Sequence, residues 1–345
     1  MKQILPAVFL IVGSIIGAGF ASGRELSLFF ANFGYNSLYF LPIVFIFFYY
    51  AFKLFLNIGS KQKFQSVFDI NAHAGSSPFF NISIVIIFTI YSSAMFAAAV
   101  EVLSNNFIEI PQMVFSLIVF VFAFLVLKFG FKGLVKVNLI LTPIIVILLV
   151  VYALYSIFVP ITEISYIPAS ENAYILPMSI IMYVFGNILL SYFIVAQCGH
   201  GLNKKQISWA AFWASLIICF SLLICIICLV VNGTVVMDAS MPFLALTLRL
   251  GDPFPLIFMA ILFLGIITSL FACLHTASLP FQKTLGKKTA ILSTSCVFLL
   301  SMLGFETIVN NCYPVFGIFG GIITVKLLMF KHKQNNSPSH NIKKF

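Results

Sequence analysis

The feature that most constrains this chain is a succession of ten apolar runs, most of them about twenty residues long, with short polar segments between them. A helix needs about twenty apolar residues to cross a bilayer core of about 30 Å. Charged residues make up only 8% of the chain and hydrophobic residues 61%, whereas soluble domains have about 25% and about 45–50%. The pattern predicts an all-α polytopic membrane protein, with no room for a soluble catalytic domain.

Hydropathy places the predicted transmembrane helices at residues 4–31, 37–57, 79–103, 112–129, 133–158, 175–198, 206–231, 253–279, 289–305 and 307–330. We expect residues 1–330 to form one transmembrane domain and 331–345 to form a basic tail. Lys2 followed by an apolar run also fits a cleavable signal peptide ending near Ala21. The apolar character continues through Leu26–Phe30, however, and this favours a spanning helix.

The distribution of charge predicts the orientation of these helices. If the N-terminus is cytoplasmic, 17 of the 19 basic residues fall on the inner side, and only Arg24 and Arg249 fall outside. Eight of the nine acidic residues then lie outside, with Asp69 as the exception. Cytoplasmic loops are enriched in Lys and Arg. We therefore expect ten transmembrane helices with both termini in the cytoplasm, a basic tail that faces lipid, and no nucleic-acid partner despite the net charge of +10.

The first predicted helix has four glycines within eleven residues, at Gly13, Gly17, Gly19 and Gly23. Each glycine weakens a helix by about 1 kcal/mol relative to alanine. The spacing of four residues from Gly13 to Gly17, and from Gly19 to Gly23, also suits close packing of two helices. The other interpretation is a discontinuous helix, whose freed N–H and C=O groups have to line a polar cavity or bind a ligand.

A second helix-weakening pair, Gly186-Asn187, lies near the middle of the sixth predicted helix. Five helices separate it from the equivalent position in the first helix, so the two halves of the chain would have opposite orientations in the bilayer. Paired interruptions in inverted halves are typical of the substrate site of a secondary transporter. The pairing therefore favours the discontinuous interpretation of both helices.

The segment Gly13–Phe20 resembles the first-helix signature of the amino acid–polyamine–organocation superfamily. The longer run Gly17–Glu25 resembles the YkvI-like branch, a group assigned to transport without a settled substrate. Other pieces that fit this branch are Phe29–Phe30, Phe33–Gly34, Met241–Phe243 and Leu250–Gly251. The resemblance implies a LeuT-type fold of two inverted five-helix repeats, about residues 1–158 and 175–330, with binding at the broken first and sixth helices.

The free N–H groups of Gly17, Ala18 and Gly19 begin the second half of the first helix and are expected to hold a substrate carboxylate or another anionic group. The other side chains expected at this site are Tyr91 and Ser92 on the third helix, and Gly186 and Asn187 on the sixth. An ordinary packed aromatic residue remains the other interpretation of Tyr91.

The coupling ion is expected near the eighth predicted helix. By resemblance to sodium-coupled members of the superfamily, an all-oxygen site would combine the hydroxyls of Thr268 and Ser269 with the carbonyls of Gly265, Gly13 and Ile16. The alternative is that both hydroxyls bond their own helix. Sodium is favoured over proton coupling, for which His275 is the candidate, and over uncoupled exchange. No other metal and no cofactor are expected.

An outer gate is expected between Arg24 and Glu306, which begins the tenth predicted helix. Ion pairs between these two helices resemble the outer gate of LeuT-type folds. Glu25 is a competing local partner for Arg24.

Other classes of protein fit less well. The sequence has no HExxH motif and almost no acids at the centres of its predicted helices, which argues against an enzyme. It has no TVGYG-like filter of a channel. We expect an ion-coupled secondary transporter of a small organic solute, an amino acid or related amine, in the cytoplasmic membrane of a bacterium. A sensor that keeps the transporter fold and binds a ligand without transport is the alternative, and the oligomeric state is open.

Overall fold

The computed structural model describes residues 4–73, 75–106, 110–127, 130–159, 173–233, 239–248, 254–286 and 288–336, which contain helices and no β-strand. The elements are α1 Ile4–Ile15, α2 Ala18–Ala21, α3 Arg24–Phe29, the 3-10 segment η1 Ala31–Phe40, α4 Leu41–Lys61, α5 Val67–His73, α6 Pro78–Asn106, α7 Gln112–Leu127, α8 Gly130–Phe158, η2 Ala173–Ile175, α9 Leu176–Cys198, α10 Lys204–Asn232, α12 Pro242–Leu248, α13 Phe254–Leu285, α14 Lys288–Ser301 and α15 Phe305–Asn336.

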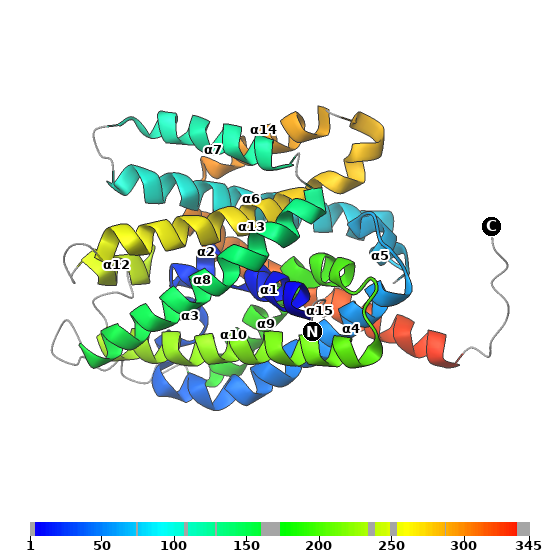
Figure 1. The fold of residues 1–345 in the computed structure, drawn as a ribbon, viewed down its shortest axis with the longest axis horizontal. Coiled ribbons are helices and arrows are strands. Elements are labelled where there is room, and N and C mark those ends of the chain that lie inside the picture. Colours follow the sequence, from blue (N-terminus) through cyan, green and yellow to red (C-terminus); the bar gives the residue numbers. More distant parts are fainter. Residues whose placement is uncertain are drawn as a thin grey trace.

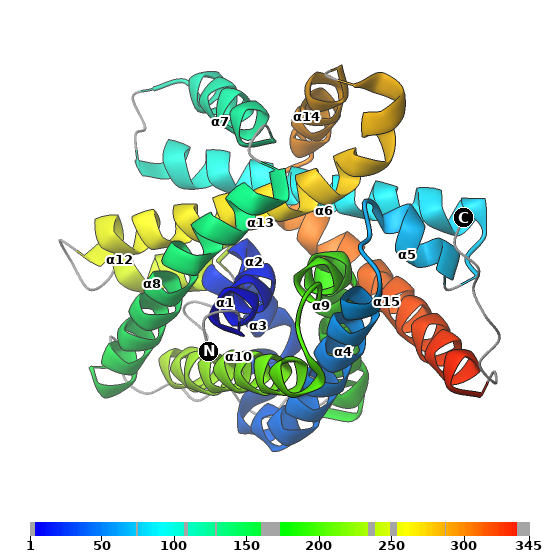
Figure 2. The same cartoon turned by 45° about the vertical axis from the view of Figure 1, so that its right-hand side comes forward.

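The helices surround a central pair formed by α1 and α9 (Figures 1 and 2). Helix α1 packs against α8, α9 and α10, and α9 also packs against α4 and α15. Helices α7 and α14 lie at one edge of the molecule, at the top of Figure 2, where both pack on α6. The two segments that sequence analysis singled out as interrupted helices therefore lie side by side at the centre.

The described residues contain six helical segments that are long and apolar enough to cross a membrane: Ala31–Lys61, Pro78–Ser104, Gly130–Phe158, Leu176–Cys198, Lys204–Asn232 and Phe254–Gln282. Helix α14 and the start of α15 meet the same test together but bend by 92° between them, and α1, α7 and the rest of α15 are shorter apolar helices. The chain is a multi-pass membrane protein. The count of ten crossings and the orientation stay predictions, and α15 continues to Asn336, past the predicted boundary at residue 330.

The prediction that the first helix is discontinuous is confirmed. Helix α1 ends at Ile15, and Gly17 has an extended backbone with φ −99° and ψ −160° before α2 begins at Ala18. A second break follows at Gly23, whose φ of +83° lies in the left-handed region that glycine tolerates best. The second half of the predicted first helix is therefore two short pieces, α2 and α3.

The predicted interruption at Gly186-Asn187 is wrong, because α9 is a continuous α-helix through both residues. The Asn187 side-chain amide donates to the carbonyl of Tyr183 at 3.0 Å, so its polar group is satisfied within the helix. Gly186 lies beside α15, and a Cβ atom there would be 3.7 Å from the backbone nitrogen of Gly317, an ordinary van der Waals distance.

Candidate binding site at the break in the first helix

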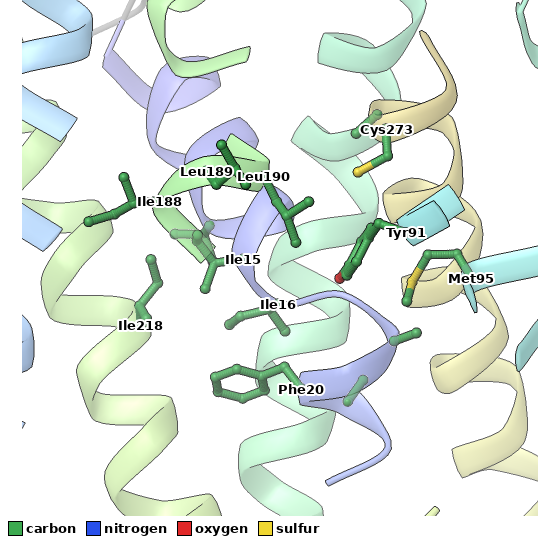
Figure 3. Close-up of a cluster of buried hydrophobic side chains, with 14 of the residues drawn as sticks. Ile15, Ile16, Phe20, Tyr91, Met95, Ile188, Leu189, Leu190, Ile218 and Cys273 are labelled. Carbon is green, nitrogen blue, oxygen red and sulfur yellow. The ribbon is translucent and has the colours of Figure 1, made fainter. Parts of the chain in front are cut away.

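The break between α1 and α2 places non-helical backbone inside the protein. The expectation that the Gly17 N–H is free is wrong, because it donates to the Ile15 carbonyl at 2.9 Å. The first N–H groups of any helix lack partners within that helix, and they lie at the positive end of its dipole. The first helical bond of α2 runs from the Ala21 N–H to the carbonyl of Gly17 at 2.8 Å. Ala18 and Phe20 are fully buried, so the start of α2 lies in the interior of the protein. Figure 3 shows the aliphatic and aromatic side chains around this break, including Ile16 and Phe20.

Gly17 is in contact with polar groups from two other helices. A methyl group at Gly17 would overlap the Ser269 hydroxyl of α13 and lie 3.6 Å from the Tyr91 hydroxyl of α6. Figure 3 shows the Tyr91 hydroxyl directed toward the break. Ser269 is 3% exposed, and its hydroxyl has no hydrogen-bond partner among the described residues. The structure thus brings together Gly17, Tyr91 and Ser269, which sequence analysis had divided between a substrate site and an ion site.

Gly19 is in contact with a carboxyl group that sequence analysis had placed elsewhere. A methyl group at Gly19 would overlap the Glu25 carboxyl, which reaches back from α3 and is only 1% exposed. Gly23, whose backbone is left-handed, lies between α2 and Glu25. The one sequence signal for this contact was Gly23, which lies between Gly19 and Glu25.

Tyr183 of α9 is a second functional candidate that sequence analysis missed. Its side chain is fully buried, and its ring packs edge-on against Phe30 at a centroid distance of 4.9 Å. Its hydroxyl has no hydrogen-bond partner in the described part of the chain. No motif marks Tyr183, because its importance arises from the neighbours that packing gives it.

Several residues predicted for the substrate site use their polar groups within their own helix. The Ser92 hydroxyl donates to the carbonyl of Phe88 at 2.7 Å, as the Asn187 amide does to Tyr183. Gly186 faces α15. These three contacts do not involve the break, so the contribution of Ser92, Gly186 and Asn187 to a binding site stays a prediction without direct support.

The residues predicted for an ion site lie in two different places around the broken first helix. Gly265 approaches α2, since a Cβ atom there would lie 3.8 Å from the Ala21 side chain, and the Thr268 hydroxyl donates to the Gly265 carbonyl at 2.9 Å. Gly13 instead lies against the side chains of Asn138 and Thr142 of α8. Within the described ranges no three His, Cys, Asp or Glu residues are grouped as metal ligands.

The predicted contact between Arg24 and Glu306 is confirmed as an ion pair, with 2.8 Å between Nη2 and Oε1. Nη2 also donates to the Asn310 side chain at 3.1 Å, and Nη1 donates to the Ala239 carbonyl at 3.3 Å. Helix α12 lies next to this network, because the Phe243 N–H donates to the Ser22 carbonyl at 2.9 Å. Arg24 thus joins α3 to α15 and to the segment before α12.

Together, the helical arrangement and the broken first helix define a membrane protein with a LeuT-type fold. The structure of MhsT in complex with L-phenylalanine matches with a TM-score of 0.71 and 17% sequence identity, over 95% of this chain and 91% of MhsT. The substrate-bound, outward-open structure of a Na+-coupled sialic acid symporter matches with a TM-score of 0.60 and 13% identity, over 95% of this chain and 78% of the symporter. No protein-family model and no curated protein sequence matches the chain, so the YkvI-like assignment remains a resemblance.

Proposed function

We propose that this chain is a secondary transporter of a small organic solute, an amino acid or related amine, that works by alternating access. The observation that carries the proposal is the buried break between α1 and α2, where the backbone of Gly17 and Gly19 lies against polar side chains from α3, α6 and α13. A transporter needs such a site to be polar and central, because its solute has to be reachable from either side in turn. The fold shared with a sialic acid symporter and with phenylalanine-bound MhsT supports this proposal.

The two ends of the broken helix differ in a way that also supports alternating access. At the α3 end, Arg24 closes the space between α3 and α15 through its ion pair with Glu306. At the opposite end, beside the start of α1, lies a cavity of about 580 Å³ between α1, α4, α8 and α9, lined in part by Pro6, Gly59 and Lys132. We infer that the Arg24 side faces outward and the cavity faces the cytoplasm, in the cytoplasmic membrane of a bacterium.

Sodium is the coupling ion that we favour over a proton. Hard cations prefer oxygen ligands. The unpartnered Ser269 hydroxyl and the Gly265 carbonyl region of α13 border the break in α1, where unwound backbone offers further oxygens. His275, the candidate for proton coupling, is 7% exposed and packs against Phe271 on the same helix.

A thermal-shift screen of the purified full-length protein tests the proposal. Amino acids, amines and organic acids are screened in sodium and in potassium, because a ligand at about 100 times its Kd stabilises the folded state by about 2.7 kcal/mol. We expect at least one ligand whose stabilisation is larger in sodium, and uptake of that ligand into proteoliposomes driven by a sodium gradient. Ser269→Ala should weaken the sodium effect, because this hydroxyl lies against Gly17 and has no hydrogen-bond partner among the described residues. Thr276→Ala is the matched control, since that hydroxyl bonds its own helix at Ala272.

Other outcomes of this screen assign the protein differently. Stabilisation that is equal in sodium and potassium would contradict sodium coupling and leave proton coupling or exchange. Ligand binding without uptake under any ion gradient would contradict transport and indicate a sensor that keeps the fold.

A further inference from the structure

A large cavity that the proposed transport does not use lies between α1 and α10, which pack against each other (Figure 2). Its volume is about 1040 Å³, and Leu139 of α8 also lines it. The wall from α1 consists of apolar side chains, among them Leu5 and Phe9. Among the residues that the structure describes, no aspartate or glutamate lines this cavity. The cavity is therefore suited to a hydrocarbon chain and carries no negative charge.

The wall from α10 changes from polar to apolar along the helix. Lys205 and Gln206 lie in the first turn of α10, and Trp209, Trp213 and Ile217 follow them. Residues three or four apart share one face of a helix, so these side chains form a single stripe. Lys205 and Ile217 are about 18 Å apart along the helix axis, slightly more than half of a bilayer core of about 30 Å. The stripe therefore spans about one leaflet, with its charge at the start of the helix.

The two tryptophans occupy the middle of this stripe. Their rings are nearly parallel, at 19°, with 6.4 Å between the ring centroids. Each is 45% exposed, in a helix that is long and apolar enough to cross a membrane, so the cavity opens toward lipid. Tryptophan favours the level of the lipid headgroups, where its ring contacts hydrocarbon and its N–H reaches polar atoms. Trp209 and Trp213 thus suit the region where a headgroup joins its acyl chains.

The charge at the polar end of the cavity is positive. Lys205 lines the cavity and is exposed, and Lys204 precedes it. Lys136 lies one turn before Leu139 on the same face of α8. In the predicted orientation these lysines face the cytoplasmic leaflet, which is anionic, and basic pockets between helices on that side bind anionic headgroups. Because the apolar cavity continues directly from Lys205, headgroup and chain can bind together, which a row of surface lysines alone does not provide.

We propose that this cavity holds an anionic phospholipid, with its phosphate at Lys205, its glycerol region beside Trp209 and Trp213, and an acyl chain between α1 and α10. Lys205 gives the site its preference for anionic over zwitterionic headgroups. The lipid contacts α1, the helix that ends at the break, and so couples the surrounding membrane to the candidate binding site. The inference does not depend on the proposed transport, because it concerns a lipid and not the solute.

Tryptophan fluorescence tests the inference, because Trp209 and Trp213 are the only tryptophans in the chain and both line the cavity. The full-length protein is reconstituted into phosphatidylcholine vesicles that contain matched fractions of brominated phosphatidylglycerol or brominated phosphatidylcholine, since bromine on an acyl chain quenches nearby tryptophan. We expect phosphatidylglycerol to bind at least about fivefold more tightly, the effect of one lysine near the membrane surface. Salt should weaken this preference, because the Debye length falls from about 10 Å at 0.1 M to about 3 Å at 1 M.

Variants assign the preference to Lys205. Lys205→Gln should bring quenching by the two lipids close together and leave quenching by phosphatidylcholine unchanged, whereas Lys205→Arg should keep the preference. The matched control is Lys288→Gln, which removes the same charge from an exposed position at the start of α14, on the opposite side of the molecule from α10 (Figures 1 and 2). Both tryptophans remain in all three variants.

Three results would overturn the inference. They are equal quenching by the two brominated lipids in the wild type, a preference for phosphatidylglycerol that survives in Lys205→Gln, and an equal loss of preference in Lys288→Gln, which would indicate general attraction to the membrane surface. No solute is present in this experiment. Failure of lipid binding is therefore seen separately from failure of the proposed transport, which shows as absence of uptake.

Discussion

At the scale of single residues, the candidate site depends on where polar atoms find their partners. The hydroxyls of Ser92 and Thr268 were predicted to face a ligand, yet each donates to a carbonyl three or four residues earlier in its own helix. Ser269 lies next to Thr268 in sequence but has no such partner. A hydroxyl that the helix already satisfies has less to offer a solute than one that packing leaves unpartnered.

The ion pair between Arg24 and Glu306 gives a prediction at the same scale. Arg24→Glu or Glu306→Arg alone places like charges where 2.8 Å now separates opposite ones, so each should lower transport of the identified solute at least about tenfold. The double reversal should recover much of this loss in proteoliposome uptake. Recovery stays partial, because the Ala239 carbonyl loses its donor. A double variant that transports no better than either single variant would refute the gate.

At the scale of elements, two helices with similar sequence signals behave differently. Both α1 and α9 have a glycine beside polar residues near their centre, and only the first helix breaks. Gly17 has an extended backbone in contact with Ser269, whereas Gly186 keeps helical geometry and lies beside α15. A glycine permits a break, but the neighbouring helices decide whether one forms.

The close contact between α9 and α15 predicts the effect of a single methyl group. Gly320→Ala would overlap the Phe185 carbonyl of α9, so it should destabilise the protein by about 1–3 kcal/mol, the usual cost of overpacking. Gly321→Ala is the matched control, because its methyl group would lie 3.7 Å from the Phe185 ring in ordinary contact. Thermal unfolding in detergent measures both. Equal midpoints for the two variants would contradict this role of Gly320.

At the scale of the whole molecule, charge orders the chain in the membrane. Ten predicted helices put 17 of 19 basic residues on one side, which no local packing contact requires. The rule that cytoplasmic loops are basic then predicts the orientation. The similarity in fold to solved transporters does not test this orientation, which therefore stays a prediction.

Labelling from outside the cell tests this orientation. In a background in which the incompletely buried native cysteines are replaced, Lys204→Cys should resist a membrane-impermeant maleimide until the cells are permeabilised. Tyr174→Cys should react in intact cells. Both positions are exposed in the structure, so access depends on the side of the membrane. Labelling of residue 204 in intact cells, or protection of residue 174, would overturn the predicted topology.

The sequence by itself indicated the membrane class, the positions of the main helices, an interruption of the first helix and Glu306 as one of two candidate partners of Arg24. These features follow from hydropathy, glycine content and the sparse outer charges, all of which can be read locally. Only the tertiary structure decided that α9 stays helical through Gly186 and that Glu25 lies against Gly19. The reason is physical: the partner of a buried polar group depends on which helices pack around it, and residues distant in sequence make those contacts.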